Sequence, residues 1–123
     1  MTATPHTIGI AQTLAVAHKM MREHQIRHLP VLDGGRLMGV VSDRDLKLIE
    51  SLKDVDPEEV LVGEAMSDEP YCVGPLASLE ETVREMARRK LGSAVVMDGE
   101  RVVGIFTAVD GLQTLAWLLE SQN

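Results

Sequence analysis

The strongest constraint on the fold is an internal repeat. The segment GVVSDRD at residues 39–45 returns as GIFTAVD at residues 104–110, an offset of 65 positions from Gly39 to Gly104. Chance rarely keeps many further positions in register at one offset without a gap. Such further pairs are Met1 with Met66, Pro5 with Pro70, Leu14 with Leu79, Met21 with Met86, and Asp33-Gly34 with Asp98-Gly99. We therefore expect two copies of one structural unit.

The composition indicates a soluble globular protein with an aliphatic core. Apolar residues make up 45% of the 123 residues and charged residues 25%, whereas aromatic residues reach only 2%, so Val, Leu, Ile, Ala and Met must fill the interior. No apolar run reaches the roughly 18 residues of a membrane span. The beginning of the chain lacks the basic and apolar regions of a signal peptide, so we expect a cytoplasmic protein. Cys72 stands alone in an apolar segment and is expected to be an ordinary buried thiol.

The net charge of −7 is concentrated between the two halves. The acidic residues of this stretch, with no Lys or Arg among them, are Asp54, Asp56, Glu58, Glu59, Glu64, Asp68 and Glu69. Nothing resembles the basic stripe that binding to nucleic acid requires. We predict one repeat over residues 1–53, an acidic connector over 54–66 and a second repeat over 67–123.

Each half is predicted to run strand, helix, strand, strand, helix. In the first half, a short strand at residues 6–8 precedes a helix from Thr13 to about His24, whose apolar residues recur at three- and four-residue spacing. Strands at residues 29–32 and 37–41 flank an Asp-Gly turn that is typical of a hairpin, and a helix begins at Ser42. The second half repeats this plan around the turn at residues 98–99.

Two further helices are expected to have distinct roles. In the connector, Asp56-Pro57-Glu58-Glu59 carries an N-cap, a first-turn Pro and a capping-box Glu, which predicts a short helix there. The last helix, from Thr107, is expected to cover its own half with an apolar face, leaving Trp117 and Leu118 on another face. The residues of the covering face are Leu112, Leu115, Ala116 and Leu119.

Two tetrapeptides, Ser42-x-x-Asp45 and Thr107-x-x-Asp110, stand where an apolar strand ends and a helix begins. The simpler interpretation is a capping box, in which hydroxyl and carboxylate each accept a backbone N–H. The functional interpretation uses the same geometry, because a helix N-terminus attracts phosphate and a carboxylate there can bind ribose hydroxyls. The tetrapeptides alone favour the capping interpretation.

The doubled unit resembles a tandem pair of cystathionine β-synthase (CBS) domains, also called a Bateman module. The resemblance covers nearly the whole chain and rests on three motifs in order. The opening Met-Thr-x-x-Pro of the family matches residues 1–5 and, with Ser for Thr, residues 66–70. The Leu-Pro-Val-x-Asp motif matches residues 29–33. The family's nucleotide signature is Gly, two mostly apolar residues, Ser or Thr, two further residues and Asp, and it matches residues 39–45 and 104–110. The resemblance implies a mixed α/β (α+β) fold of two β-α-β-β-α repeats packed about a pseudo-twofold axis.

The resemblance also implies ligands and site residues. Family members often bind AMP, ADP, ATP or S-adenosylmethionine in two clefts, with the Ser or Thr of the signature on phosphate or ribose and its Asp on the ribose hydroxyls. These positions are Ser42 and Asp45 in the first repeat and Thr107 and Asp110 in the second.

Basic residues at the edge of the first cleft are further candidates. Family members often place a basic residue before the Leu-Pro-Val strand, where this chain has Arg27-His28, and Arg44 lies within the first signature. Gly92 and Ser93 replace Arg27-His28 in the second half, so the first cleft is expected to supply most of the phosphate contacts. The alternative for Arg27 is a solvated cation at a strand end.

Metal binding and catalysis have little support in the sequence. His24 and His28 lie four residues apart, but no Cys or carboxylate completes a ligand set, and neither a Ser-His-Asp order nor a P-loop is present. The leading hypothesis is a non-catalytic sensor that binds an adenosine nucleotide and acts on an effector protein. The alternatives are a ligand-free dimerisation or adaptor module and, with less support, an enzyme.

A homodimer is expected through helices that include Trp117 and Leu118. A Trp side chain buries on the order of 200 Å², and monomers seldom leave such a patch in water. The family resemblance agrees, because tandem CBS pairs commonly form dimers through their helices. The alternative is that Trp117 packs on the connector near residues 60–62.

Overall fold

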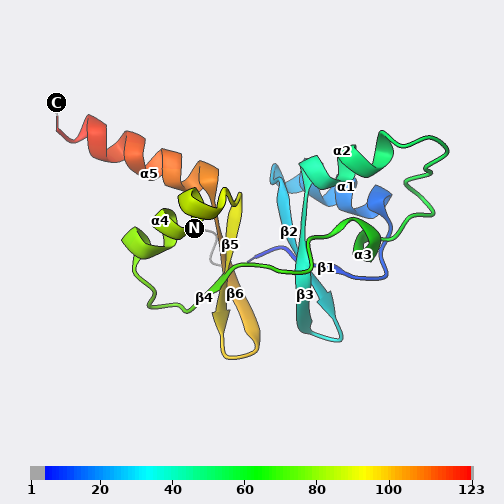
Figure 1. Cartoon of the computed structure of the whole chain (residues 1–123), viewed down its shortest axis with the longest axis horizontal. Helices are drawn as coiled ribbons and strands as arrows, with labels where there is room; N and C mark the ends of the chain where they lie inside the picture. Colours follow the sequence, from blue (N-terminus) through cyan, green and yellow to red (C-terminus); the bar gives the residue numbers. More distant parts are fainter. Residues whose placement is uncertain (1–4, 123) are drawn as a thin grey trace. The chain divides into compact units, whose positions relative to one another are not determined.

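The computed structural model describes residues 5–122 and divides the chain into two compact units. One unit is His6–Pro70, and the other contains the chain from Tyr71 onward (Figure 1). The connector, residues 54–66, therefore packs with the first unit. Each unit is described by itself below.

Both units have the expected order of strand, helix, strand, strand and helix. The first contains β1 (Ile8–Gly9), α1 (Leu14–His24), β2 (His28–Asp33), β3 (Arg36–Ser42) and α2 (Asp43–Glu50), followed by the short α3 (Val62–Ala65). The second contains β4 (Cys72–Val73), α4 (Leu79–Arg89), β5 (Ser93–Asp98), β6 (Arg101–Thr107) and α5 (Ala108–Glu120). The predicted mixed α/β fold is confirmed.

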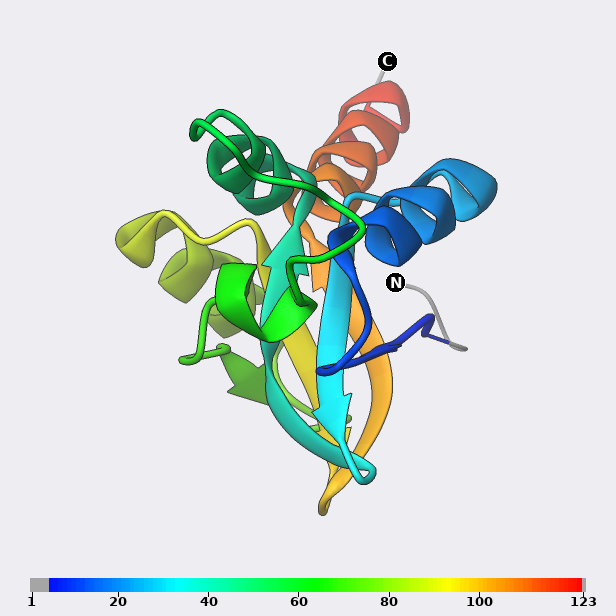
Figure 2. The same cartoon turned by 90° about the vertical axis from the view of Figure 1, so that its right-hand side faces the viewer.

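Each unit is built on a three-stranded sheet with the same topology. In the first sheet β1 pairs parallel with β2, and β2 pairs antiparallel with β3; the second repeats this pattern with β4, β5 and β6. The register shifts between Val31 and Leu32 in one sheet and between Val96 and Met97 in the other, which are equivalent positions at the offset of the repeat. Figure 2 shows the long hairpin of β2 and β3 with α1 and α2 at one end.

Local sequence signals account for the turns and helix starts. Gly34, Gly35 and Gly99 have φ values of 57°, 85° and 62°, the left-handed region that the tight hairpin turns need. The side chains of Thr13 and Ser78 cap α1 and α4 by accepting a backbone N–H three residues later. The hairpins and the start of α1 were correctly predicted from these residues.

The first unit has an extensive core between its helices and its sheet. Leu14, Leu29 and Leu46 are fully buried there, and Val62 of α3 joins them from the connector. The remaining buried members of this cluster are Ile8, Ala17, Met21, Val31 and Val41. Fully burying a Leu or Val stabilises a fold by about 1.5–3 kcal/mol, so this cluster holds α1 and α2 on the sheet.

The second unit has a smaller core because two large residues of the first are replaced. Ala94 stands at the position of Leu29, and Gly111 at the position of Leu46. Its buried cluster consists of Met86, Ala94 and Phe106. The prediction that α5 covers its own half is wrong: no residue of α5 is buried, and Leu112 is 65% exposed. Leu115, Ala116 and Leu119 are exposed as well.

The connector is helical, but not where its sequence predicted. Asp56 accepts the N–H of Glu58 at 2.9 Å as expected, yet residues 57–59 form only a turn, and the helix is α3. The chain cannot continue as a helix from Asp56 because its backbone bonds to α1 and to the residue before its cap: the N–H groups of Leu14 and Ala15 donate to the carbonyls of Val60 and Pro57, and the N–H of Val62 donates to the Gln12 carbonyl. These contacts bring Val62 into the core.

Cys72 is exposed, which corrects the expectation of a buried thiol. It lies in the two-residue strand β4, where successive side chains point to opposite faces, and the neighbouring Val73 is the one that packs against the core. Partial desolvation still raises the pKa of the Cys72 thiol, which keeps it protonated at neutral pH.

Among the described residues, no helix is both long and apolar enough to cross a membrane.

We predict that Gly39→Ala destabilises the first unit. Gly39 lies where the connector crosses β3: Val40 and Ser67 exchange backbone hydrogen bonds of 3.0 and 2.9 Å, and an added Cβ would collide with the Ser67 carbonyl and the Met66 sulfur. Overpacking of this kind costs about 1–3 kcal/mol. Urea unfolding should show the loss.

Gly74→Ala is the matched control, because an added Cβ there meets nothing within 4 Å. It should leave the free energy of unfolding nearly unchanged. Equal losses in Gly39→Ala and Gly74→Ala would contradict this account of the connector crossing.

Candidate functional site

The first signature forms a reciprocal cap at the start of α2. Ser42 Oγ accepts the N–H of Asp45 at 3.1 Å, and Asp45 Oδ2 accepts the N–H of Ser42 at 2.9 Å. Ser42 is the last residue of β3 with extended backbone angles, so the strand turns directly into the helix. The capping box predicted from Ser42-x-x-Asp45 is confirmed.

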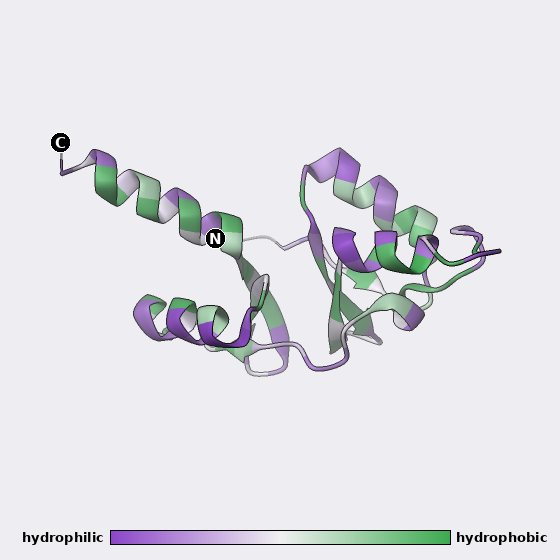
Figure 3. Ribbon diagram, turned by 45° about the horizontal axis from the view of Figure 1, so that its top comes forward, coloured by the Kyte–Doolittle hydropathy of each residue, from purple (hydrophilic) through white to green (hydrophobic). Residues whose placement is uncertain are grey.

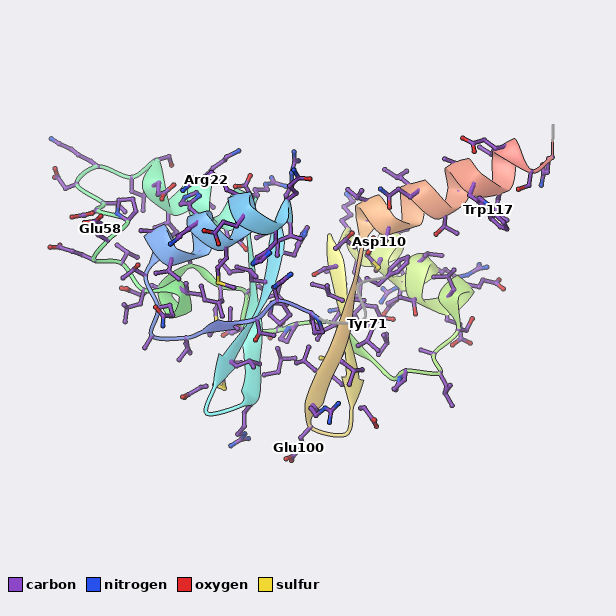
Figure 4. All side chains as sticks on the ribbon, turned by 180° about the vertical axis from the view of Figure 1, so that it is seen from behind. Arg22, Glu58, Tyr71, Glu100, Asp110 and Trp117 are labelled. Atoms are coloured by element: carbon purple, nitrogen blue, oxygen red, sulfur yellow. The ribbon has the colours of Figure 1, made fainter. Side chains whose placement is uncertain are left out.

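The second signature has the same geometry at the start of α5. Thr107 Oγ1 accepts the N–H of Asp110 at 3.2 Å, and Asp110 Oδ2 accepts the N–H of Thr107 at 2.8 Å. All four side chains are half-buried, so both caps remain accessible from solvent. Figure 4 shows Asp110 at the beginning of α5.

The caps leave polar groups available at both helix starts. Each Asp uses Oδ2 for its cap, and within the described part of the chain Oδ1 has no hydrogen-bond donor. Likewise, the N–H of Arg44, in the first turn of α2, has no acceptor among the described residues. A carboxylate oxygen beside an open helix N-terminus can accept a hydroxyl hydrogen bond while the N–H groups face an anion.

The structure brings the basic candidates of the first repeat to the same end of the sheet. The N–H of Asp43 donates to the Arg27 carbonyl at 2.9 Å, and His28 pairs with Ser42 between β2 and β3. The Arg27 side chain is exposed and forms no ion pair with a residue that the structure describes, and the Arg44 side chain is also exposed. Arg27, His28, Ser42 and Asp45 therefore lie together.

The second repeat has the same backbone arrangement without the basic side chains. The N–H of Ala108 donates to the Gly92 carbonyl at 3.0 Å, and Ser93 pairs with Thr107 between β5 and β6. Neither Gly92 nor Ser93 can supply positive charge at this end of the sheet. The two repeats thus differ in basic side chains at equivalent positions, and the expected difference in phosphate binding stays a prediction.

A polar contact that the sequence analysis missed joins the two helices of the first repeat. His18 Nε2 lies 2.8 Å from both Glu50 Oε1 and Glu50 Oε2, linking α1 to the end of α2. The signal was present in the sequence, because His18 lies in the same stripe of α1 as the buried Leu14, Ala17 and Met21. A polar residue in an apolar stripe indicates a specific partner on the facing element.

His24, which the sequence analysis considered together with His28 as a metal ligand, has a different partner in the structure. The ring of His24 stacks on that of His6, with centroids 3.6 Å apart and an interplanar angle of 13°. Among the residues that the structure describes, no three His, Cys, Asp or Glu side chains are grouped to hold a metal ion.

Known proteins share both the sequence motifs and the architecture. The family model described as CBS domain matches residues 1–49 and 62–116. Hypoxic response protein 1 of Mycobacterium tuberculosis is 34% identical over 111 residues, covering 89% of this chain and 78% of that protein. The solved structure of AcuB from Vibrio cholerae is 34% identical, with a TM-score of 0.85 over 99% of this chain and 90% of the other.

A more distant solved structure has the same fold. The CBS domain pair of protein MJ0100, solved in complex with 5′-methylthioadenosine and S-adenosyl-L-methionine, has a TM-score of 0.82 at 21% identity, covering 93% of this chain and 90% of the other. Together with the two matched regions and the repeated topology, these similarities show that the chain belongs to the CBS-domain family and contains a tandem pair of CBS repeats.

Proposed function

We propose that this protein is a non-catalytic regulatory module that binds an adenosine nucleotide at its strand-to-helix signatures. The observation that carries the proposal is the doubled arrangement in which Ser42 with Asp45, and Thr107 with Asp110, stand at open helix starts. Candidate ligands are AMP, ADP, ATP and S-adenosylmethionine, because all contain a ribose that a carboxylate can hold. A bound nucleotide would then change how the module acts on an effector protein.

The capping and ligand-binding roles are compatible. The cap occupies one carboxylate oxygen of Asp45 and leaves Oδ1 for a ribose hydroxyl, while Arg27 and the Arg44 N–H offer positive charge to phosphate. The MJ0100 domain pair, which has the same fold, was solved with two adenosine compounds. The shared fold supports an adenosine compound as a ligand class. The low sequence identity means that it does not indicate which compound this chain selects.

The second candidate function is a ligand-free dimerisation or adaptor module. Two observations favour it: both signatures form complete capping boxes, and α5 exposes most of its apolar side chains. The two functions differ in one measurable property, which is nucleotide binding. Neither function includes turnover of a nucleotide, which an enzyme would show.

We include a homodimer in the proposed function. Trp117 is 64% exposed and Leu118 46% exposed on α5, and Figure 4 shows Trp117 on the outer half of this helix. Of the alternative contact at residues 60–62, Val62 is fully buried in its own unit, whereas Leu61 is 38% exposed. A second chain is the cover that would remove the indole from water.

Asp45→Asn should weaken nucleotide binding and preserve stability, whereas Asp45→Ala should weaken both. The amide oxygen of Asn can still accept the Ser42 N–H, but a hydrogen bond from ribose to a neutral acceptor is worth about 0.5–1.5 kcal/mol, against about 1.5–3 kcal/mol for one to a carboxylate, so we expect a loss of about 10-fold in affinity. Ala also removes the hydrogen bond from the Ser42 N–H to the Asp45 carboxylate, worth about 1 kcal/mol, while the cap by Ser42 Oγ remains. Isothermal titration with AMP, ADP, ATP, S-adenosylmethionine and NAD, together with urea unfolding, measures both effects.

A cap-only role for Asp45 would give the opposite pattern, with stability reduced in Asp45→Ala and nucleotide affinity unchanged in both variants. Ser78→Ala is the control, because Ser78 caps α4 and lies in neither signature. It should lower stability without changing affinity. No heat of binding for any of the five compounds with the wild type would favour the ligand-free module.

The first repeat should bind phosphate more strongly than the second. We expect Arg27→Ala to reduce the affinity for ATP more than that for adenosine, because only ATP loses a charge-assisted contact. Asp110→Asn should cost less phosphate-dependent affinity than Asp45→Asn, since Gly92 and Ser93 supply no cation. A larger loss in Asp110→Asn would reverse this ranking of the two sites.

The homodimer predicts a mass near twice 13.5 kDa for the wild type in light scattering. The double variant Trp117→Glu, Leu118→Glu should give the mass of one chain, because burying unpaired carboxylates opposes association. A single-chain mass for the wild type would exclude the dimer. A dimeric double variant would place the interface elsewhere.

A further inference from the structure

Part of the connector covers the start of α1 in the first unit, and we call residues 57–63 the covering segment. The N–H of Leu14 donates to the Val60 carbonyl at 3.0 Å. The N–H of Ala15 donates to the Pro57 carbonyl at 2.9 Å. These are the first two N–H groups of α1, and no carbonyl of the helix itself can accept them. The covering segment therefore completes the hydrogen bonding at this helix start.

The covering segment also bonds to the loop before α1 and contributes to the core. The N–H of Val62 donates to the Gln12 carbonyl at 2.8 Å, and the N–H of the next residue, Gly63, donates to the Ile10 carbonyl at 3.1 Å. The side chain of Val62 is fully buried in the same cluster as Leu14. Main-chain hydrogen bonds and one aliphatic side chain thus hold the segment in place.

The second unit has the same edge without a covering segment. The offset of the repeat places Leu79 at the position of Leu14, and Leu79 is 49% exposed whereas Leu14 is fully buried. Among the residues that the structure describes, the N–H groups of Leu79 and Glu80 have no acceptor. Within the same residues, the loop carbonyls of Pro75 and Ala77 have no donor. All four backbone groups stand at positions that the covering segment bonds in the first unit.

The difference arises in the chain that follows the second helix of each repeat. Helix α2 ends at Glu50, and the chain then returns to the first unit as the connector. Helix α5 continues instead to Glu120, with hydrophobic residues along its length (Figure 3). At the offset of the repeat, residues 116–120 of α5 stand where the chain has left α2. No described segment of the second unit therefore bonds to the start of α4 as the connector bonds to α1.

The charges beside the covering segment are opposite on its two sides. Asp56 and Glu58 of the connector line one hollow together with His18 and Arg22 of α1. Complementary charges of this kind contribute to the choice of partner. The residues at the two basic positions are aliphatic in the second unit: Val83 and Ala87. An acidic segment would find no cation at these two positions of α4.

The start of α4 carries negative charge instead. Glu80 and Glu81 lie in its first turn and are exposed. Arg84 lies 2.7 Å from Glu80, whereas Glu81 has no ion pair with a described residue. A segment that binds here is therefore expected to carry Lys or Arg where the connector carries Asp56 and Glu58.

We propose that the exposed edge at residues 75–80 binds a linear segment of an effector protein, in which an aliphatic run follows basic residues. This inference deepens the proposed regulatory function and rests on it for the existence of an effector. The carbonyls of the segment accept the N–H groups of Leu79 and Glu80, and its own N–H groups donate to the two loop carbonyls. One aliphatic side chain packs against Leu79, as Val62 does in the cluster of Leu14. Main-chain bonds then give affinity, and the aliphatic and basic side chains give specificity.

Two synthetic peptides test the proposal. The first has the sequence of residues 56–66, DPEEVLVGEAM, and the second carries Asp56→Lys and Glu58→Lys in the same sequence. Each is titrated into the isotope-labelled full chain, and the backbone amide signals are followed by NMR. The basic peptide should bind about 3- to 10-fold more tightly than the acidic one at low salt. Val62→Asp in the basic peptide should weaken binding by at least about 10-fold, because it would bury an unpaired charge.

The amide signals of the edge itself are the direct readout. Those of Leu79 and Glu80 should shift, and their exchange with solvent should slow, because the peptide carbonyls accept both N–H groups. The signals of Leu14 and Ala15 should stay unchanged, since the covering segment already accepts these two N–H groups. The first unit thus serves as a control within the same molecule.

Leu79→Pro removes one of the donors and preserves the helix start. Pro is favoured at the first position of a helix, and the preceding Ser78 has the extended backbone, with φ −63° and ψ 130°, that a following Pro requires. Leu79→Ala is the matched control, because it shortens the same side chain and keeps the N–H. Leu79→Pro should reduce peptide affinity at least about 3-fold more than Leu79→Ala does. Circular dichroism verifies that both variants are folded.

Three results would overturn the assignment. The first is the absence of shifts at Leu79 and Glu80 with both peptides at millimolar concentration. The second is equal peptide affinity of folded Leu79→Pro and Leu79→Ala. The third is a set of shifts that follows protein concentration alone, which would assign the edge to a second copy of the chain.

Nucleotide titration of the same samples separates this proposal from the proposed sensor function. Nucleotide binding without peptide binding would overturn the effector site and leave the sensor intact. Peptide binding without nucleotide binding would support the effector site and favour an adaptor module over a sensor.

Discussion

The closure of each repeat depends on the side chain that the second helix places over the core. In the first repeat Leu46 is fully buried, and the contacts around it hold α1, α2 and the connector's Val62 in one cluster. In the second, Gly111 supplies no such contact, and α5 diverges from α4 although its strands and its cap repeat those of the first unit. The helix pair is closed where Leu29 and Leu46 fill the core, and open where Ala94 and Gly111 replace them.

Most of the backbone could be predicted from the sequence because it is specified by short-range chemistry. The Asp-Gly turns, the cap at Thr13 and the boxes at Ser42 and Thr107 each involve residues within a few positions of one another. The failures lie where long-range contacts decide. The chain around Asp56 looks like a helix start in isolation, but its backbone bonds to α1 take precedence and move the helix to residues 62–65.

The candidate site was partly predictable for the same reason. The positions of Ser42, Asp45, Thr107 and Asp110 follow from strand ends and helix starts, and the pairing of β2 with β3 places His28 beside Ser42. The role of α5 was not predictable, because apolar spacing along a helix does not reveal whether the facing side contains a leucine or a glycine. The alignment of Leu46 with Gly111 shows that the second repeat lacks this leucine. Its effect on the exposure of α5 is evident only from the structure, where Leu46 is buried.

The unequal cores have a consequence for how the protein unfolds. The cluster of the first unit gathers side chains from α1, both hairpin strands, α2 and the connector, while that of the second consists of Met86, Ala94 and Phe106. Local opening costs less free energy where fewer apolar contacts must be broken, so we expect amide protons of β5 and β6 to exchange with solvent through an opening that leaves β2 and β3 protected. A single midpoint in a melting curve would then average the unfolding of the second unit and that of the first. The first unit, which has the larger core, would remain folded after the second had unfolded.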